Sequence, residues 1–393
     1  MKEKHVILRT RATSLTRGPF SGPSMTPFGF ESAVGAIEID IDDIERSRIS
    51  ALSRDREVVA IAPVMPLKLI APVQVADVDA PAGQTITWGV KAVGADSSPY
   101  TGDGVVVAVL DTGIDAGHSA FSGVQIVEKD FTGEGNGDQH GHGTHCAGTI
   151  LGRDTENTRI GVARGVKKAV IGKVLGSQGG STDQIFRAIT WAIENGANVI
   201  SMSLGMDFPG YVKALMESGL PAEPAASRGL EGYRANVLLF DRLSLVLNSL
   251  ATFAQPVILV AAAGNESERP TWEIAVSPPA VAEGVISVAA VGEGAQGMEV
   301  ARFSNTGADV SGPGVNVTSA RAGGGLRSMS GTSMATPHVA GVAALWAEKL
   351  SKQGQLTSDH LTARVVGNAA ISPLKPGFDP SDVGAGLVLA PQQ

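Results

Sequence analysis

Short apolar runs alternate with amphipathic stretches from Gly104 onward, and this alternation restricts the fold more than any other feature of the chain. A strand that is apolar at nearly every position needs cover on both faces, as in a parallel sheet with helices on each side. We therefore predict an α/β fold. The predicted strands cover residues 105–110, 169–175, 198–203, 257–262 and 285–291.

The helices between these strands have recognisable ends. Ser181 or Thr182 is predicted to cap a helix that ends at Glu194, and a second helix is predicted from about residue 330 to residue 349. Active sites of parallel sheets lie at the carboxyl ends of the strands. The polar residues found there are therefore the candidates for chemistry.

The first eighty residues have a different pattern, which is typical of a small α+β unit. The expected elements are strands at 5–11, 36–40 and 58–62, a Ser-, Gly- and Pro-rich loop at 13–35 and a helix at 42–53. A run of Ala, Pro, Val and Asp without periodicity at 71–84 is typical of a linker. We predict two domains, with a boundary near residue 80: an α+β domain at 1–80 and an α/β domain at 81–393.

Composition excludes several classes of protein. Lys and Arg total 31 and Asp and Glu total 39, so the net charge of −8 gives no reason to expect a nucleic acid or an anionic membrane as a partner. The single cysteine, Cys146, cannot form an internal disulfide or a four-cysteine zinc site. No run approaches the roughly 18 apolar residues of a membrane span, and residues 1–13 lack the apolar core of a signal peptide. We therefore expect a cytoplasmic protein, with leaderless export as the alternative.

Three polar motifs lie at predicted strand ends or at a helix start, and each has a plain structural alternative. Asp111 follows a run of apolar residues, where it either needs a partner or serves as a turn residue in Asp-Thr-Gly. Asn265, in Ala-Ala-Ala-Gly-Asn, either stabilises a turn or donates its amide to a developing oxyanion. Ser333, in Gly-Thr-Ser, is either a helix cap or part of a turn whose N–H groups hold an oxyanion.

A histidine-rich motif contains His140, His142 and His145, followed directly by Cys146. Metal binding is the first alternative for such a cluster. However, His142 and His145 lack a carboxylate at zincin spacing, and Cys146 is adjacent to His145 rather than two residues away. The pattern favours a positioned histidine base, and we assign no metal to these residues.

Taken together, the motifs place Asp111, His142 and Ser333 in the chain order of the subtilisin arrangement, with Asn265 between the last two. The segments Asp-Thr-Gly-Ile-Asp, His-Gly-Thr-His-Cys-Ala-Gly, Ala-Ala-Gly-Asn and Gly-Thr-Ser-Met-Ala-Thr-Pro-His-Val-Ala-Gly resemble the signature segments of the subtilisin-like serine proteases. The resemblance covers roughly residues 88–391. Its Cys beside the motif histidine is similar to the proteinase K and thermitase-like branch. It implies a subtilisin-like parallel sheet with helices on both faces.

The resemblance implies a serine endopeptidase that forms an acyl-enzyme on Ser333. His142 would take the proton from Ser333 and return it to the leaving amine, while Asp111 orients the imidazole and stabilises its cationic form. Asn265 and the backbone N–H of Ser333 would stabilise the oxyanion. This chemistry requires no cofactor.

Two segments resemble those that bind a substrate backbone as an added strand. They are Gln178, Gly179 and Gly180, and Ser203, Leu204 and Gly205. The opposite wall of the first side-chain pocket is predicted at Ala262, Ala263 and Gly264. Because these walls are small and uncharged, we expect an apolar or neutral substrate side chain between them. Loop flexibility is the alternative reason for the glycines.

Two regions depart from the family pattern. Ala120 stands where many members have the aspartate of a tight calcium site, so structural calcium is possible but that site is expected to be altered. The chain between Gly205 and Gln255 is longer than usual. We predict an insertion at about 206–234, as a loop with several prolines before a helix resumes near Ala235. We interpret it as a lid or specificity loop; a surface elaboration is the alternative.

Residues 1–80 loosely resemble subtilase propeptides, which assist folding and leave their C-terminal strand in the active site. On this interpretation the N-terminal segment is a partner of the enzyme, and self-cleavage between about Ile70 and Thr87 activates a zymogen. A permanently attached accessory domain is the alternative.

Other function classes share these residues. A peptide ligase or macrocyclase uses the same acyl-enzyme, and joined rather than hydrolysed products would identify it. A maturation protease of one peptide precursor is a further alternative. A non-catalytic peptide-binding module would not need all four functional groups. The sequence therefore predicts a serine endopeptidase that acts on a peptide or protein substrate.

Overall fold

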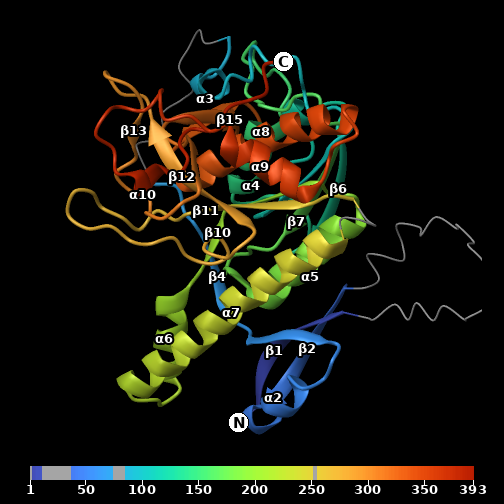
Figure 1. The fold of residues 1–393 in the computed structure, drawn as a ribbon, viewed down its shortest axis with the longest axis vertical. Coiled ribbons are helices and arrows are strands. Elements are labelled where there is room, and N and C mark those ends of the chain that lie inside the picture. Colours follow the sequence, from blue (N-terminus) through green and yellow to red (C-terminus); the bar gives the residue numbers. More distant parts are fainter. Residues whose placement is uncertain (1, 11–36, 74–84, 251–254) are drawn as a thin grey trace, which may run out of the picture.

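The computed structural model describes residues 2–10, 37–73, 85–250 and 255–393 (Figure 1). The predicted loop at 13–35 and the predicted boundary near residue 80 lie outside these residues. Figure 1 shows a large main body, formed by residues 85–393, above a small N-terminal unit. We use "N-terminal unit" for residues 2–10 and 37–63 throughout.

The main body contains an eight-stranded sheet in the order β13-β12-β11-β9-β5-β7-β6, with β14 also paired to β12. All pairings are parallel except that of β12 with β13. The strands are β5 (Val106–Asp111), β6 (Gln125–Asp130), β7 (Lys168–Lys173), β9 (Val199–Met202), β11 (Ile258–Ala262), β12 (Val285–Gly292), β13 (Glu299–Val300) and β14 (Val310–Pro313). The predicted α/β fold is confirmed.

Helices cover both faces of this sheet, as a fully apolar strand requires. Successive residues of β5 alternate between two cores: Val107 and Val109 belong to one, Ala108 and Leu110 to the other. The first core includes side chains of α4 (His142–Leu151), α8 (Thr332–Lys352) and α9 (Ser358–Gly367). The second includes those of α5 (Thr182–Glu194) and α7 (Ala222–Leu250).

Smaller elements complete the main body. They are α3 (Trp88–Ala92), a short 3-10 helix at Ser119–Phe121, the hairpin β15 (Val317–Ala320) and β16 (Leu326–Met329), and α10 (Pro380–Val383). Among the helices in the described part of the chain, none has the length and apolar character that a membrane crossing requires.

The N-terminal unit is a three-stranded antiparallel sheet in the order β2-β1-β3, with one helix. Its elements are β1 (Lys2–Thr10), β2 (Ile37–Glu45), α2 (Arg46–Leu52) and β3 (Val58–Pro63). The predicted helix at 42–53 begins later than expected, because Asp42 and Asp43 pair with His5 and Lys4 in the β1–β2 ladder. The apolar face of the sheet shares a core with α5 and α7.

A second small sheet joins the N-terminal unit to the main body. It has the order β10-β4-β8, and both pairings of its central strand are antiparallel. The central strand is β4 (Pro66–Leu69), and the flanking strands are β8 (Gly180–Ser181) and β10 (Leu204–Met206). Thus the chain that leaves the N-terminal unit runs as an added strand between two segments of the main body.

The insertion at 206–234 is helical, which corrects the prediction of a loop. It contains α6 (Phe208–Glu217) and the first half of α7, which begins at Ala222 rather than near Ala235. Asp207 caps α6 by accepting a hydrogen bond from the N–H of Gly210, with Pro209 in the first turn. Pro224 similarly lies in the first turn of α7. Proline is tolerated there because first-turn N–H groups have no acceptor within the helix.

Candidate active site

Asp111 is the last residue of β5 and His142 is the first residue of α4. Asp111 Oδ1 accepts a hydrogen bond from Nδ1 of His142 at 2.7 Å, and both side chains are buried. The helix approaches the strand this closely because residue 143 is glycine: a Cβ there would lie 2.2 Å from the carbonyl oxygen of Gly113. The local sequence therefore fixes the imidazole against the carboxylate.

The surroundings of His142 set its protonation. Burial lowers the pKa of His142, but the Asp111 carboxylate outweighs this effect and holds that pKa well above its ordinary value. Nδ1 is directed at Asp111, so the other ring nitrogen, Nε2, is the one that can take up a proton. Nε2 is buried and has no hydrogen-bond partner among the described residues.

Ser333 is the second residue of α8 and is fully buried. Pro337 has no N–H, so the carbonyl of Ser333 lacks the usual helical donor four residues on. That carbonyl accepts instead from the hydroxyl of Ser203 at 3.2 Å and from the thiol of Cys146 at 3.4 Å. Cys146 Sγ also lies 3.8 Å from Nδ1 of His142, so Ser333 and His142 share a neighbour.

Asn265 follows β11 and is held in one orientation by the start of α8. Its Oδ1 accepts hydrogen bonds from both the backbone N–H and the hydroxyl of Thr332, each at 2.8 Å. The amide Nδ2 is therefore free to act as a donor, close to the start of α8: a Cβ on Gly331 would lie 3.0 Å from it. The first-turn N–H of Ser333 has no acceptor within α8, so the helix start and the Asn265 amide offer two N–H donors from neighbouring elements.

The residues after β4 occupy this site. The hydroxyl of Ser333 donates to the carbonyl oxygen of Ile70 at 2.8 Å, and Nδ2 of Asn265 donates to that of Ala71 at 2.9 Å. Further along, the N–H of Val73 donates to the carbonyl of Ser330 at 2.9 Å. A peptide bond of the chain itself, Ile70–Ala71, therefore lies at the serine hydroxyl.

The two segments predicted to bind a substrate backbone lie on either side of β4. Gly180 pairs with Leu67, while Leu204 and Gly205 pair with Leu69 and Lys68. The remaining members of these segments are Gln178 and Gly179, in the turn before β8, and Ser203, which lies between β9 and β10. Thus β8 and β10, which come from separate parts of the main body, each pair with one edge of β4 through backbone hydrogen bonds.

The predicted pocket wall lies at the end of β11. Ala262, Ala263 and Gly264 are buried, and Nδ2 of Asn305 donates to the carbonyl of Ala263 at 3.1 Å. The side chain of Ile70 is buried near Gly205, where a Cβ would lie 3.5 Å from Ile70 Cγ1. An aliphatic side chain therefore lies beside Gly205, one of the predicted substrate-binding residues.

The other motif histidines have different roles from His142. Nε2 of His145 is bonded to the backbone carbonyls of Val317 and Arg327 at 3.0 and 3.2 Å, and burial lowers the pKa of His145 to about 3. His140 is exposed. His145 thus ties α4 to the β15–β16 hairpin as a neutral ring, and only His142 meets the carboxylate.

Metal ligation is limited by the same contacts. Asp111, His142 and Cys146 form a group, within the described residues, whose donor atoms could reach one ion. An ion there would displace the hydrogen bond between Asp111 and His142. At the altered calcium position, Ala120 is buried, and its backbone N–H and carbonyl bond to His118 and Arg153. The prediction that this calcium site is altered stays untested.

Asp138 was missed by sequence reasoning. Its Oδ1 accepts from the Thr112 hydroxyl at 2.8 Å and from the Gly141 N–H at 2.8 Å, and its Oδ2 accepts from the N–H and hydroxyl of Thr144 at 2.8 and 2.7 Å. Burial raises its pKa, but the hydrogen bonds from Thr144, Gly141 and Thr112 outweigh this effect and lower the pKa of Asp138. The carboxylate ties the residue after Asp111 to the first turn of α4. An acidic residue just before a helix start was the available signal.

The arrangement combines a serine hydroxyl, an imidazole oriented by a buried carboxylate, and two convergent N–H donors. The Ser333 hydroxyl donates to the carbonyl oxygen of Ile70, and Nε2 of His142 has no partner among the described residues, so the structure does not show a hydrogen bond between them. A hydroxyl that a positioned base can reach can add to a carbonyl carbon, and the donors can stabilise the oxyanion that results. An extended peptide passes through the same point. The geometry is therefore suited to acyl transfer from a peptide bond.

Comparisons with known proteins agree with this chemistry. A family model described as "Subtilase family" matches residues 102–386. Proteins named "Subtilisin-like protease 1" from Trichophyton rubrum and Trichophyton equinum are each 33% identical to the chain, over 305 and 310 residues, and the matches cover 74% of the chain and 52% of each relative. The protein of that name from Arthroderma gypseum is 33% identical over 305 residues, with 74% and 54% covered. The chain thus spans about half the length of the curated relatives that it matches.

These relatives correct one expectation. We expected a cytoplasmic protein because residues 1–13 lack an apolar signal core. The relatives are secreted subtilisin-like proteases, which points to an extracellular location instead. The first residues of this sequence are therefore no guide to the compartment.

Proposed function

Because the chain belongs to the subtilase family, we propose that it is a serine endopeptidase that hydrolyses peptide bonds through an acyl-enzyme on Ser333. The observation that carries the proposal is the peptide bond placed at the serine: the hydroxyl of Ser333 lies 2.8 Å from the carbonyl oxygen of Ile70. Asp111 and His142 supply the oriented base, and Asn265 supplies a donor.

In the first step the oxygen of Ser333 attacks the substrate carbonyl carbon, while Nε2 of His142 takes the hydroxyl proton. The raised pKa of His142 makes its neutral ring a stronger base, and Asp111 stabilises the imidazolium that forms. His142 then gives the proton to the leaving amine. Water repeats the sequence on the acyl-enzyme, which releases the new carboxylate and restores Ser333.

The negative charge that develops on the substrate oxygen is stabilised by Nδ2 of Asn265 and the backbone N–H of Ser333. Thr332 fixes the Asn265 amide before the reaction begins, so little reorganisation is needed when the charge appears. In the uncut chain Nδ2 donates to the carbonyl of Ala71, one residue beyond the attacked one. On this mechanism the hydrogen bond from Nδ2 of Asn265 moves to the oxygen of Ile70 as the tetrahedral intermediate forms.

We infer that the N-terminal segment is a propeptide and that the enzyme cuts its own Ile70–Ala71 bond. The pairing register supports this assignment: Leu69 lies opposite Leu204, so Ile70 is the residue that reaches the serine. The addition of β4 between β8 and β10 is the way that extended peptides bind to exposed strand edges.

The side chains of β4 and of Ile70 indicate which substrate residues the enzyme should prefer. Leu67 and Ile70 are buried, so we expect aliphatic side chains at the bond and three residues before it. Lys68 Nζ lies 3.1 Å from Oε1 of Glu266, whose other oxygen accepts from Asn305 at 2.9 Å. A basic residue is therefore preferred two positions before the cut residue, by only a few-fold because this ion pair is partly exposed.

The experiment combines a fluorophosphonate with a quenched peptide that has the sequence of residues 66–72. We expect hydrolysis of the peptide between the residues that correspond to Ile70 and Ala71, and one adduct that maps to Ser333. The matched control is Ser351→Ala, which removes an exposed serine hydroxyl near the other end of α8 and should keep both activities. Hydrolysis that survives in Ser333→Ala would refute the proposal. Joined peptide products would identify a ligase instead.

A further inference from the structure

The two main-body segments that pair with β4 keep contact with the chain after β8 and β10 have ended. Thr182 follows β8 directly; its backbone N–H donates to the carbonyl of Met65 at 2.9 Å, and its hydroxyl accepts from the N–H of Met65 at 3.0 Å. Asp207 follows β10 directly, and its backbone N–H donates to the carbonyl of Pro66 at 2.9 Å. The backbone contacts on both sides of β4 therefore continue toward the start of the chain.

A further contact comes from the inserted hairpin, residues 207–236, which consists of α6 and the first half of α7. Figure 1 shows the hairpin extending from the main body alongside the N-terminal unit. Asn236 is fully buried, and its Nδ2 donates to the carbonyl of Pro63 at 2.9 Å and to that of Gly232, one turn earlier in α7, at 3.0 Å. The carbonyls of Pro63, Met65 and Pro66 are thus all bonded to the main body.

The side chain of Met65 is enclosed in the same region. It is fully buried, in a core that also contains side chains of α5 and α7. Gly232 leaves room for it, because a Cβ at that position would lie 3.3 Å from Sδ of Met65. A methionine side chain is flexible enough to fill an irregular apolar space. The main body therefore offers a place for one long apolar side chain, five positions before the cut residue Ile70.

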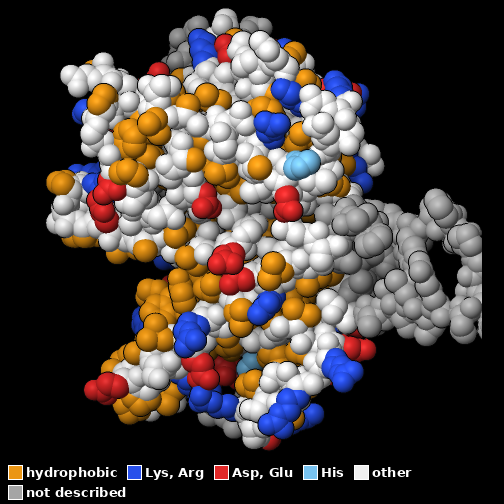
Figure 2. Space-filling view, viewed as in Figure 1, with side chains coloured by type: hydrophobic (Ala, Val, Ile, Leu, Met, Phe, Trp, Pro, Cys, Tyr) orange, Lys and Arg blue, Asp and Glu red, His pale blue; other side chains and the backbone are white. Residues whose placement is uncertain are grey.

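The burial of Asn236 contrasts with the rest of the hairpin. Hydrophobic side chains gather over the hairpin in the space-filling view (Figure 2), and Met216 and Leu230 are 46% and 56% exposed. A hairpin arranged for solvation alone would bury apolar side chains and expose an amide. Here the buried amide donates to a peptide carbonyl, which indicates a binding role for Asn236.

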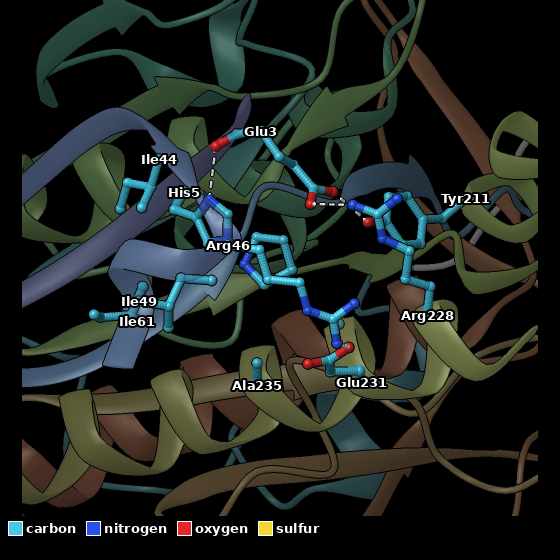
Figure 3. A pocket seen from close by; sticks show the side chains of 12 residues that line it. Glu3, His5, Ile44, Arg46, Ile49, Ile61, Tyr211, Arg228, Glu231 and Ala235 are labelled. Atoms are coloured by element: carbon cyan, nitrogen blue, oxygen red, sulfur yellow. Dashed lines mark hydrogen bonds and ion pairs between the residues drawn. The ribbon is translucent and has the colours of Figure 1, made fainter. Parts of the chain in front are cut away.

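Other contacts of the hairpin depend on the folded N-terminal unit. Figure 3 shows a pocket between the two, where Glu3 of β1 accepts a hydrogen bond from the hydroxyl of Tyr211 at 2.7 Å and pairs with Arg228 at 3.2 Å. Glu3 lies on a different strand from residues 63–66, so a single extended peptide does not supply this carboxylate. The hydrogen bonds to residues 63, 65 and 66 go to backbone groups, which every peptide has.

We propose that Thr182, Asp207, Gly232 and Asn236 form an extended substrate subsite, which binds the residues four to seven positions before the cut residue. This inference rests on the proposed function, because the subsite is continuous with the strand pairing that leads to Ser333. The substrates are unfolded protein segments or long peptides, since eight residues up to and including the cut residue must be extended. A long apolar side chain such as methionine is preferred five positions before the cut residue.

The test compares two quenched peptides on one preparation of the processed wild-type chain. One has the sequence of residues 66–72 and the other that of residues 63–72, so only the longer peptide reaches Thr182 and Asn236 through residues 63 and 65. We expect kcat/KM to be about tenfold higher for the longer peptide, because the methionine side chain and three added hydrogen bonds outweigh the ordering of three more residues. We call this ratio the length advantage; it does not depend on how much of the enzyme is active.

Two changes in the longer peptide separate the side-chain preference from length itself. Met65→Ala should lower kcat/KM about fivefold, because it removes the side chain that becomes fully buried. Val64→Ala is the matched control: Val64 is only partly buried, and its N–H bonds to the carbonyl of Lys4 in the N-terminal unit rather than to the main body. The control should change kcat/KM by less than about twofold. Equal effects of the two changes would overturn the inferred methionine preference.

Changes in the enzyme test the polar groups. Thr182→Val removes the acceptor for the N–H of Met65 and should lower the length advantage about fivefold, whereas Thr182→Ser keeps the hydroxyl and the advantage. Asn236→Ala should lower the advantage about threefold. Asn368→Ala is its matched control, because that amide also donates to the carbonyl four residues earlier, that of Arg364, but at an exposed position. Circular dichroism of each variant checks the fold.

The outcomes distinguish the subsite from the proposed chemistry. A length advantage that falls in Thr182→Val but not in Thr182→Ser supports the subsite. Equal kcat/KM values for the two peptides would overturn the inference and leave the proposed function standing, and so would an advantage that both Thr182→Val and Asn236→Ala leave unchanged. Failure of the wild-type chain to cut either peptide would overturn the proposed function, and the inference with it.

Discussion

The proposed catalytic centre and the interface between the N-terminal unit and the helical hairpin of residues 207–236 both join residues that are far apart in the sequence, but they do so in different environments. Asp111, His142 and Ser333 are at most 1% exposed and come from a strand end and two helix starts. At the interface, the side chains of Glu3 in β1 and Arg228 in α7 are 29% and 26% exposed. Buried polar groups are costly to leave unpaired. Substitutions in the proposed centre should therefore have large effects, whereas the interface should weaken in small, salt-dependent steps.

The largest effect should come from Ser333→Ala, which removes only the proposed nucleophile. Hydrolysis of the peptide based on residues 66–72 should fall by roughly 10⁶-fold, as triad deletions do in a subtilisin. Circular dichroism should show an unchanged fold, because the lost hydroxyl makes one described contact to the N-terminal segment, to the carbonyl of Ile70. Loss of the folded structure would contradict a purely chemical role for this hydroxyl.

Asp111→Asn should lower kcat by about 10⁴-fold, since the imidazole loses its orienting carboxylate. It should also move the pH profile. In the wild type the pKa of His142 is raised by Asp111, and activity requires the neutral ring, so activity is lost as the pH falls through that raised pKa. Without the negative charge the pKa falls, and the acid limb of kcat/KM should shift to lower pH. An unshifted limb would contradict the assignment of His142 as the base.

Asn265→Ala should lower kcat by about 10²–10³-fold with little change in KM, because the amide acts mainly on the oxyanion. Steady-state kinetics of the processed chain with the same peptide measures both constants. Asn368→Ala is a suitable control: that amide is exposed and bonds only within α9, to the carbonyl of Arg364. A change in KM alone would mean that Asn265 helps to bind the substrate before the reaction rather than to stabilise the oxyanion.

Asp138→Asn should have the smallest effect on hydrolysis, a fall of about tenfold to a hundredfold in kcat, by loosening the start of α4 against Asp111. The substitution would put an NH₂ group where Oδ2 now accepts hydrogen bonds from the N–H and the hydroxyl of Thr144. A donor would then face two donors. Asp130→Asn is the matched control, because Asp130 accepts similar bonds from Thr132 and Gly135 in a loop. A lower melting temperature without a change in kcat would make Asp138 structural only.

The main sheet and the candidate catalytic motifs could be predicted from the sequence because both depend on local patterns. The apolar run before Asp111 predicts a buried strand, and the turn after it places the carboxylate at the carboxyl end. His142 and Ser333 lie at helix starts that their own motifs specify. Such features depend on residues that are close together in the chain, so they can be recognised from one sequence.

Other features were missed because tertiary contacts create them. β4 has only four residues, and its strand form depends on pairing with β8 and β10, more than a hundred residues later. Residues 206–234 were predicted as a loop from their prolines, yet Pro209 and Pro224 lie in first helical turns, where the missing N–H costs nothing. Asp138 gains its role only when β5 and α4 meet.

The proposed mechanism requires that Ser333 cuts the chain at the strand that lies beside it. The intact mass of the purified wild-type chain and of Ser333→Ala, under denaturing conditions, measures this directly. We expect one wild-type fragment that ends at Ile70 and another that begins at Ala71, with Ser333→Ala uncut. An uncut wild-type chain, or a cut at another bond that also occurs in Ser333→Ala, would contradict it.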